Sequence, residues 1–412
     1  MIANRALSVL SLSLFACLAA CSSSGEDATA STTGQARSAV IKGKPSDASQ
    51  DAVVLLVHYD PSTREVGECT GTLLAPRLVL TARHCVGDTD AYAACRADGT
   101  PIAAGAIRKN HKPETMYVFT GKDRPDFSRG EVDPAGQGMK ILDDGGKNLC
   151  NHDIALIVLQ EPIEDAQIAP IRLDGDVEVG ERITAVGWGI TEKTLQPDTR
   201  MQRRDVKITI VGPDKAEGGV PPNEFEVGES ICSGDSGGPA IAQETKAVVG
   251  VVSRGGNAQA DADPNNPAAS CIGGRNLYTK IAPFKDLILK GFELAEAEPW
   301  LEGGPDPRKL KPKAACTSGD ECRSALCLPD PDAANETTCA EDCSATDTCS
   351  VEGEVCTAEG DSKVCRAPRK EPPASAGSGA CSAGAPSPRS GLGGATLVFG
   401  LLALASLRRK RA

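Results

Sequence analysis

The sequence predicts a protein of more than one domain that is exported and held together by disulfide bonds. Its 412 residues exceed the size of one ordinary domain. Its 17 cysteines fall in clusters, which is typical of disulfides formed in an oxidising compartment and unusual in a cytosolic enzyme. A net charge of −12 and an aromatic share of 3% argue against a nucleic-acid-binding protein, which needs a basic surface and usually stacking rings.

Residues 1–20 predict an export signal, because Arg5 is followed by an apolar run too short to remain in a bilayer as a span. The run ends in Leu-Ala-Ala-Cys at Cys21, which resembles the lipobox of bacterial lipoproteins, where the signal is cut before a cysteine whose thiol carries diacylglycerol. The resemblance implies lipidation of Cys21, and an ordinary signal peptide with an incidental cysteine is the alternative. Residues 21–39 are expected to be a propeptide and flexible tether.

Residues 391–412 predict a transmembrane sorting tail. An uncharged stretch of 17 residues, 391–407, is followed at once by Arg-Arg-Lys-Arg, so the basic end is expected inside the cell. With the small residues around Cys381, the segment resembles the sorting tail of myxobacterial surface proteins, which is processed so that the protein is displayed. A plain membrane anchor is the alternative. Both make the membrane an expected partner and the cell envelope the expected location.

Three segments in the middle of the chain carry residues suited to catalysis. The first contains Cys69 and ends in Thr-Ala-Arg-His-Cys at His84 and Cys85. The second is His-Asp-Ile-Ala-Leu around Asp153, and the third is Cys-Ser-Gly-Asp-Ser-Gly-Gly-Pro around Ser236. These segments resemble those that present the catalytic residues of the chymotrypsin/trypsin family of serine proteases. The order His, Asp, Ser is also the order of this fold rather than of the other triad folds.

The resemblance extends over about residues 40–292. It implies an all-β domain of two six-stranded antiparallel barrels with a C-terminal helix, which we place at 40–297. Gly-Trp-Gly at 187–189 resembles the turn that opens the second barrel. The apolar spacing of 283–294 suits the family's terminal helix.

The resemblance assigns a chemical task to each motif residue. Ser236 would attack the substrate, because a serine hydroxyl becomes a strong nucleophile when a base, here His84, takes its proton. Asp153 would accept a hydrogen bond from the other ring nitrogen and stabilise the imidazolium. The amides of Gly234 and Ser236 would form the oxyanion hole. No cofactor and no metal is implied, and the expected partner is a protein or peptide substrate.

Val40 is expected to become the N-terminus of the active enzyme. Val-Ile-Lys-Gly at 40–43 resembles the family's activation terminus, whose new ammonium group pairs with the aspartate before the nucleophile, here Asp235. The residue before Val40 is Ala39 rather than Arg or Lys. We therefore expect cleavage by a protease that prefers small residues, and the enzyme itself is one candidate.

The resemblance also places residues in the substrate cleft: Ser230, Ser253, Arg254, Gly255 and Asn276. Ser230 matches the pocket floor and is not acidic, so a strict preference for Lys or Arg is not expected. Gly255 leaves the entrance open, but Asn276 stands where the family usually has Gly and should narrow or polarise the base. A small to medium uncharged residue is therefore predicted before the scissile bond. Residues 253–255 would pair with the substrate backbone, and Arg254, in place of the customary Trp, would read upstream side chains by charge.

The number of cysteines fits complete pairing. Fourteen remain when those in the signal, the lipid site and the sorting site are set aside. The resemblance implies two pairs in 40–297, and elimination leaves a third: Cys69–Cys85, Cys232–Cys271 and Cys95–Cys150. The third would close a long insertion before Asp153. A second insertion, 256–270, is rich in Asp and Asn and could bind calcium, although a solvated loop is favoured.

Eight further cysteines, from Cys316 to Cys365, fall within 50 residues that contain no aromatic side chain. A small disulfide module is predicted at 316–366, and metal binding is the alternative, although no histidine accompanies these cysteines. Spacing leaves 105 connectivities open for eight cysteines. The segments 298–315 and 367–390 are expected to be linkers.

Together these patterns predict a surface-anchored serine endopeptidase that is exported as an inactive precursor. The competing hypothesis is a catalytically silent protease-fold protein of the cell envelope that serves binding or adhesion. The reactivity of Ser236 separates the two, because only an assembled triad activates this hydroxyl.

Overall fold

The computed structural model describes residues 40–368, apart from 130–131, 216–218, 258–265, 267, 331–332, 334 and 361. The chain divides into two compact units, residues 1–341 and 342–412. The predicted signal, Cys21, the tether, most of the calcium-loop candidate, Cys381 and the tail lie outside the described residues. In the described part of the chain, no helix has the length and apolarity needed to cross a membrane.

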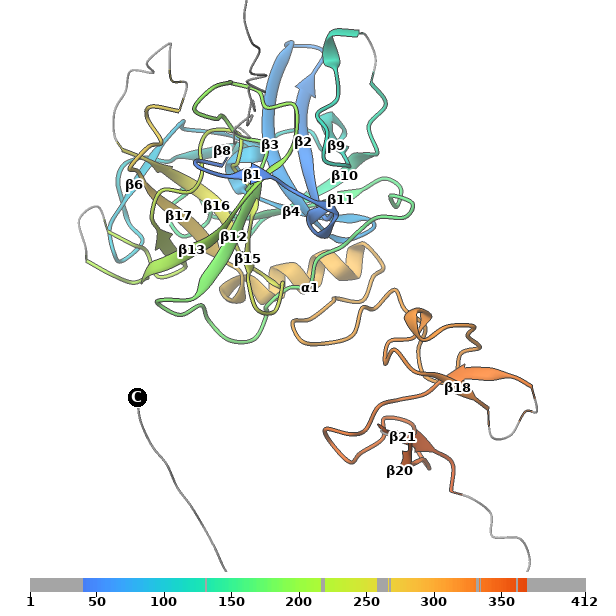
Figure 1. Ribbon diagram of the computed structural model, residues 1–412. Helices are drawn as coiled ribbons and strands as arrows, with labels where there is room; N and C mark the ends of the chain where they lie inside the picture. The colour runs from blue at the N-terminus through green and yellow to red at the C-terminus, as the bar shows by residue number, and fades with distance from the viewer. Residues whose placement is uncertain are drawn as a thin grey trace, which may run out of the picture. The chain divides into compact units, whose positions relative to one another are not determined.

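The first barrel is a closed antiparallel sheet of six strands in the order β10-β11-β4-β3-β2-β9 (Figure 1). Its strands are β2 (Val53–Asp60), β3 (Glu65–Ala75), β4 (Leu78–Thr81), β9 (Met116–Phe119), β10 (Gly136–Leu142) and β11 (Ala155–Leu159). Successive side chains of a strand point to opposite faces. Apolar residues such as Leu56, Leu80 and Ile157 are fully buried in one core.

The second barrel has six strands in the order β13-β12-β15-β16-β17-β14 and closes where β14 pairs with β13. Its strands are β12 (Arg182–Gly187), β13 (Met201–Val211), β14 (Glu224–Val227), β15 (Pro239–Ala242), β16 (Val248–Gly256) and β17 (Arg275–Lys280). A two-residue strand, β1 (Lys44–Pro45), adds to β13. The two antiparallel barrels confirm the architecture predicted from the sequence.

The helix α1 (Lys285–Leu294) confirms the predicted C-terminal helix and covers the first barrel. Its buried residues Ile288 and Phe292 belong to the core of that barrel. A Cβ at Gly291 would lie 2.7 Å from Leu156 and 3.2 Å from Leu78. The missing side chain therefore lets the helix backbone approach β4 and β11 closely.

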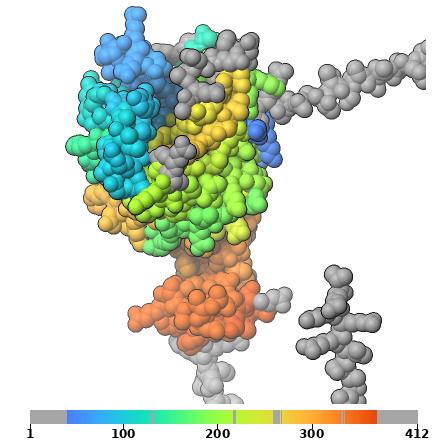
Figure 2. All heavy atoms as spheres, turned by 90° about the vertical axis from the view of Figure 1, so that its left-hand side faces the viewer, coloured from blue at the N-terminus to red at the C-terminus, as the bar shows by residue number. Residues whose placement is uncertain are grey.

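Short elements lie outside the barrels. The insertion after His84 contains the pair β5–β8 (Gly87–Thr89 with Ile107–Asn110) and the hairpin β6–β7 (Ala93–Cys95 with Pro101–Ala104). Single 3-10 turns are η1 (Ala48–Gln50), η2 (Arg83–Cys85), η3 (Pro113–Thr115), η4 (Phe127–Arg129), η5 (Ala282–Phe284) and η6 (Gly319–Glu321). Figure 2 shows this insertion, in cyan, beside the lime-green surface of the second barrel.

The described cysteines form seven disulfides. The structure joins Cys69 to Cys85, Cys95 to Cys150 and Cys232 to Cys271, which are the pairs expected from the sequence. The C-terminal cysteines pair as Cys316–Cys327, Cys322–Cys339, Cys343–Cys356 and Cys349–Cys365. The structure thus selects one of the connectivities that spacing left open. Because these sulfurs are bonded to one another, they are not the free thiolates that a metal site would use.

The C-terminal cysteines belong to two units rather than one. Two of their disulfides lie in the first compact unit with β18 (Cys327–Pro329) and β19 (Thr337–Cys339). The other two lie in the second unit, with β20 (Val355–Glu359) and β21 (Ser362–Arg366). Each half therefore has its own two-stranded sheet and its own pair of disulfides.

Part of the segment expected to be a linker, 298–315, packs within the first unit. The amide of Ile171 donates to the carbonyl of Trp300 at 2.8 Å. Glu302 forms an ion pair with Arg172 at 2.6 Å. These contacts attach the segment to residues that precede β12.

Candidate active site

His84 lies on η2, directly after β4 of the first barrel. The disulfide Cys69–Cys85 ties the next residue to β3. The backbone amide of His84 donates to Asp153 Oδ1 at 3.0 Å, and its ring Nδ1 lies 2.9 Å from Asp153 Oδ2. An Nδ1–H that donates to the carboxylate leaves Nε2 free to accept a proton.

Asp153 is 1% exposed and lies just before β11. The hydroxyl of Ser253, on β16, donates to its Oδ2 at 2.6 Å. Burial alone would raise the pKa of Asp153, but the charge of His84 and the hydrogen bonds to the carboxylate outweigh burial and lower the pKa. The carboxylate is therefore ionised at neutral pH.

The pKa of His84 is the result of opposing effects. Burial lowers it, the charge and hydrogen bond of Asp153 raise it, and the charge of Arg254 lowers it. The net effect raises the pKa of His84 above its ordinary value of 6.5. Asp153 therefore strengthens the imidazole as a base, which suits proton transfer near neutral pH.

Ser236 lies in a tight loop before β15, and glycines allow its backbone conformation. Gly234 has φ +96°, and Gly237 has φ +78°. The amides of Asp235, Gly237 and Gly238 donate to backbone carbonyls. Among the described residues, no backbone carbonyl accepts from the amide of Gly234 or of Ser236. Both amides are therefore available to a developing oxyanion.

The three predicted catalytic residues, His84, Asp153 and Ser236, line one cleft of about 1150 Å³, whereas Ser230 and Gly234 are not among its lining residues. His84 and Asp153 come from the first barrel, and Ser236 comes from the second. The cleft is also lined by the predicted substrate-binding residues Ser253, Arg254, Gly255 and Asn276. The ring of His84 is hydrogen-bonded to Asp153, and the hydrogen bond from nucleophile to base commonly tightens only when substrate is bound. The arrangement can therefore perform acyl transfer through a serine.

Asn276, on β17, fills space beside the cleft. Its side chain is fully buried, and its Nδ2 donates to the Gly228 carbonyl at 3.0 Å. Ser230 is also fully buried, with its Oγ 3.5 Å from the same Nδ2. A Cβ built on Gly255 would collide with Asn276 Oδ1. The Asn276 carboxamide therefore lies directly against Gly255.

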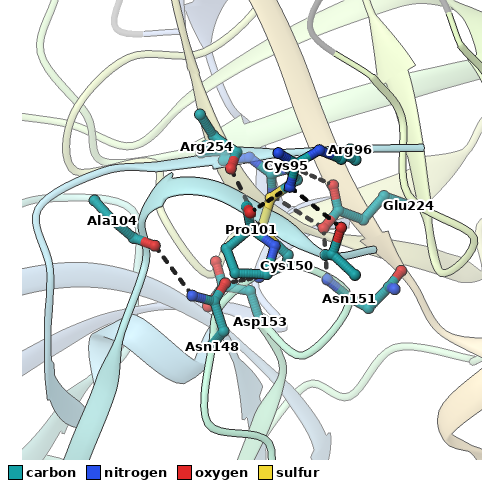
Figure 3. Close-up of a disulfide and its surroundings, with 12 residues drawn as sticks. Cys95, Arg96, Pro101, Ala104, Asn148, Cys150, Asn151, Asp153, Glu224 and Arg254 are labelled. Atoms are coloured by element: carbon teal, nitrogen blue, oxygen red, sulfur yellow. Dashed lines mark hydrogen bonds and ion pairs between the residues drawn. A yellow bond between two sulfur atoms is a disulfide. The ribbon is translucent and has the colours of Figure 1, made fainter. Parts of the chain in front are cut away.

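Arg254 contacts an acidic residue that sequence reasoning did not identify. Its guanidinium forms two hydrogen bonds with Glu224 of β14, and Glu224 is fully buried. Figure 3 shows this pair near the Cys95–Cys150 disulfide, Asn151 and Asp153. The charge of Arg254 is therefore compensated inside the protein. The only sequence signal for Glu224 is a charge at the start of a short strand.

Asp235 and Val40 are both fully buried. The Asp235 carboxylate accepts from the amides of Gly189 at 2.8 Å and of Cys232 at 2.9 Å. Burial raises the pKa of Asp235 to about 7, although these two bonds oppose the shift. In the uncut chain the Val40 nitrogen is a peptide amide, so it has no positive charge to offer Asp235.

Comparisons with known proteins place this chain in a family. The Trypsin family model matches residues 41–288. The chain is 28% identical to beta-fibrinogenase mucrofibrase-5 of Protobothrops mucrosquamatus over 60% of this chain and 85% of that protein. It is 24% identical to a trypsin of Saccharopolyspora erythraea over 54% of this chain and 86% of that protein. It is 26% identical to phenoloxidase-activating factor 1 of Holotrichia diomphalia over 57% of this chain, but it spans only 64% of that relative. Because the family model covers more than half of the sequence, the chain belongs to the trypsin family of serine proteases.

Proposed function

We propose that the chain is a serine endopeptidase that acts through His84, Asp153 and Ser236. The main observation that supports the proposal is the chain of hydrogen bonds from Ser253 through Asp153 to His84. This chain ends in the cleft that Ser236 also lines. The Ser236 Oγ bonds to the substrate carbonyl carbon while His84 takes its proton. The carbon–nitrogen bond then breaks as His84 gives that proton to the leaving amine. Water then attacks the acyl carbon while His84 takes a proton from it. The bond between this carbon and Ser236 Oγ breaks as His84 returns the proton to Ser236.

A fluorophosphonate probe tests this proposal on the protein cleaved before Val40, once N-terminal sequencing has confirmed that start. We expect labelling at Ser236, because only an assembled triad makes this hydroxyl reactive. The variant Ser236→Ala is the control and should not be labelled. Absence of labelling in the cleaved wild-type protein would favour the silent binding or adhesion protein instead.

The proposed residue before the scissile bond is uncharged and small to medium in size. Asn276 occupies the space against Gly255, and we infer that a long substrate side chain would otherwise enter there. Ser230 provides no negative charge for Lys or Arg. A panel of peptides that differ only at this position should show the highest kcat/KM for uncharged residues of small to medium size, and strong cleavage after Arg would refute the assignment.

The same pocket supports self-activation of the precursor. The residue before Val40 is Ala39, which is small and uncharged. One active molecule could therefore cleave the Ala39–Val40 bond of another. The precursor variant Ser236→Ala, which cannot cut itself, should be converted to a chain that starts at Val40 when active wild-type enzyme is added. An unchanged N-terminus would require a different activating protease.

Export and attachment to the envelope are proposed from the sequence of the two chain ends. Cys21 would carry the lipid before activation, and the C-terminal tail would hold the protein afterwards. Metabolic labelling with a fatty-acid analogue should mark the uncut wild-type chain but not Cys21→Ser. Removal of 391–412 should release the chain that is cut before Val40 from the membrane fraction of cells, because that chain no longer contains Cys21.

A further inference from the structure

A buried ion pair lies next to the chain of hydrogen bonds that runs from Ser253 through Asp153 to His84. Glu224 is fully buried on β14, and Arg254 on β16 has a side chain that is 15% exposed. We propose that Glu224 and Arg254 are positioning residues that orient the Ser253 hydroxyl and the Asp153 loop for catalysis. This inference rests on the proposed peptidase function and concerns residues that do not touch the scissile bond.

Arg254 determines which way the Ser253 hydroxyl points. Arg254 Nη1 lies 3.3 Å from Ser253 Oγ and 3.0 Å from Glu224 Oε1. A guanidinium has only donors, whereas a hydroxyl has one proton and can also accept. Ser253 must therefore accept from Arg254, and its single proton is left for Asp153 Oδ2 at 2.6 Å.

Glu224 supports the loop that precedes Asp153 through Asn151. The amide of Asn151 donates to Glu224 Oε1 at 3.0 Å, and the amide of Asn223 donates to Asn151 Oδ1 at 2.9 Å. Asn151 has φ +71°, a left-handed conformation that Asn tolerates better than most residues. Glu224 thus fixes the residue two positions before Asp153.

The Cys95–Cys150 disulfide extends this support to the cleft wall. It joins the residue before Asn151 to the hairpin β6–β7 (Figure 3). The Gly99 turn of that hairpin also packs against the Asn151 side chain. The Glu224 carboxylate therefore links β14 with Arg254 of β16 and with the Asp153 loop, and the disulfide joins the hairpin to that loop.

Arg254 also acts on His84 through its charge. Asp153 and Arg254 are the charged groups that shift the pKa of His84, in opposite directions. Arg83, on the same turn as His84, instead faces Asp143 at 3.6 Å. Removing the charge of Arg254 should therefore raise the pKa of His84.

The test uses the full chain activated at Val40 and the double variant Glu224→Gln with Arg254→Gln. This variant replaces two buried charges together, because changing only one partner would leave the other charge buried and unpaired. Per active site titrated with fluorophosphonate, we expect kcat to fall by about 10- to 100-fold, as is typical of a small misplacement of reacting groups. The acid limb of the kcat/KM profile should move to higher pH.

A second ion pair provides the matched control. Arg172 also has a side chain that is 15% exposed, and it pairs with Glu302 at 2.6 Å away from the cleft residues. The double variant Arg172→Gln with Glu302→Gln removes an ion pair whose carboxylate is 20% exposed, against 0% for Glu224, and leaves Glu181, the 19% exposed second partner of Arg172, without this contact. It should keep kcat per active site and the position of the acid limb. A purely structural role of the Glu224–Arg254 pair predicts the same behaviour for both double variants, and that result would overturn the inference.

The variant Arg254→Lys keeps the test decisive if the double variant does not fold. It retains the positive charge but cannot reproduce the fork that reaches both Glu224 and Ser253. We expect a lower kcat with little movement of the acid limb, and an unchanged kcat would overturn the inference. Failure of the proposed function itself would be distinguishable, because the wild-type enzyme would then not be labelled at Ser236.

Discussion

The carboxylate of Asp153 contacts His84 twice, through the backbone amide at 3.0 Å and through ring Nδ1 at 2.9 Å. The amide contact fixes where the imidazole lies, and the ring contact fixes which nitrogen carries the proton. Nδ1–H is then the donor, and Nε2 is left to act as the proposed base for Ser236. One buried carboxylate therefore controls both the position and the protonation of the proposed general base.

The variant Asp153→Asn should lower kcat by about 10⁴-fold, because an amide at this position favours the wrong tautomer of His84. The pH dependence should also change. The charge and hydrogen bond of Asp153 raise the pKa of His84, so their loss lowers it. The acid limb of kcat/KM, which reports protonation of the free base, should move to lower pH. A limb that moved to higher pH would contradict this account of His84.

Asn276 should control the size of the substrate side chain. Asn276→Gly opens the space against Gly255, so kcat/KM should rise for larger uncharged residues by roughly 10- to 200-fold per added methylene-sized contact. Steady-state kinetics with matched peptides would measure this change. Ser230→Asp alone should not create cleavage after Arg, because Asn276 still fills the pocket. The double variant should create it, and an equal gain in the single variant would show that Asn276 is not the block.

The candidate site residues that lie in contiguous sequence motifs could be predicted from the sequence. His84, Asp153 and Ser236 are each surrounded by residues that serve the same local turn or strand, so each could be recognised without knowledge of the fold. Glu224 could not be predicted, because its importance depends on Arg254, 30 positions away. The segment after 297 has the Pro, Gly and Lys of a linker, and its attachment through Glu302 to Arg172 depends on a contact across 130 positions.

The contacts of Trp300 and Glu302 predict that the stable domain extends beyond residue 297. A chain that ends at 297 lacks Trp300 and Glu302, so Arg172 keeps Glu181 as its acidic partner and the surface under Trp300 becomes exposed. Its melting temperature should be about 2–8 °C below that of a chain that ends at 313, which corresponds to a loss of one or two kcal/mol in a domain of this size. Thermal unfolding of the two chains, both carrying Ser236→Ala, measures the difference. Equal melting temperatures would show that 298–313 adds no stability.

Asp235 should make the stability of the uncut precursor depend on pH. Burial raises its pKa from 3.8 to about 7 in the folded chain. Between about 4 and about 7 the folded chain therefore holds a proton that the unfolded chain has released. The stabilising contribution is fully present below this window and is lost as the pH rises through it. Denaturant unfolding of Ser236→Ala should show this loss, and Asp235→Asn should remove it.

Cleavage after Ala39 should prevent the loss of stability that the uncut precursor shows as the pH rises. The new ammonium group of Val40 would pair with the ionised Asp235, which stabilises the charged carboxylate and lowers its pKa in the folded state. The Ser236→Ala chain, cut by added wild-type enzyme, should therefore keep its stability across the window in which the uncut chain loses it. Unfolding curves of the cut and uncut forms at matched pH measure the difference directly. Parallel curves would mean that Val40 does not pair with Asp235, and activation would then need another source of order in the loop of Gly234 and Ser236.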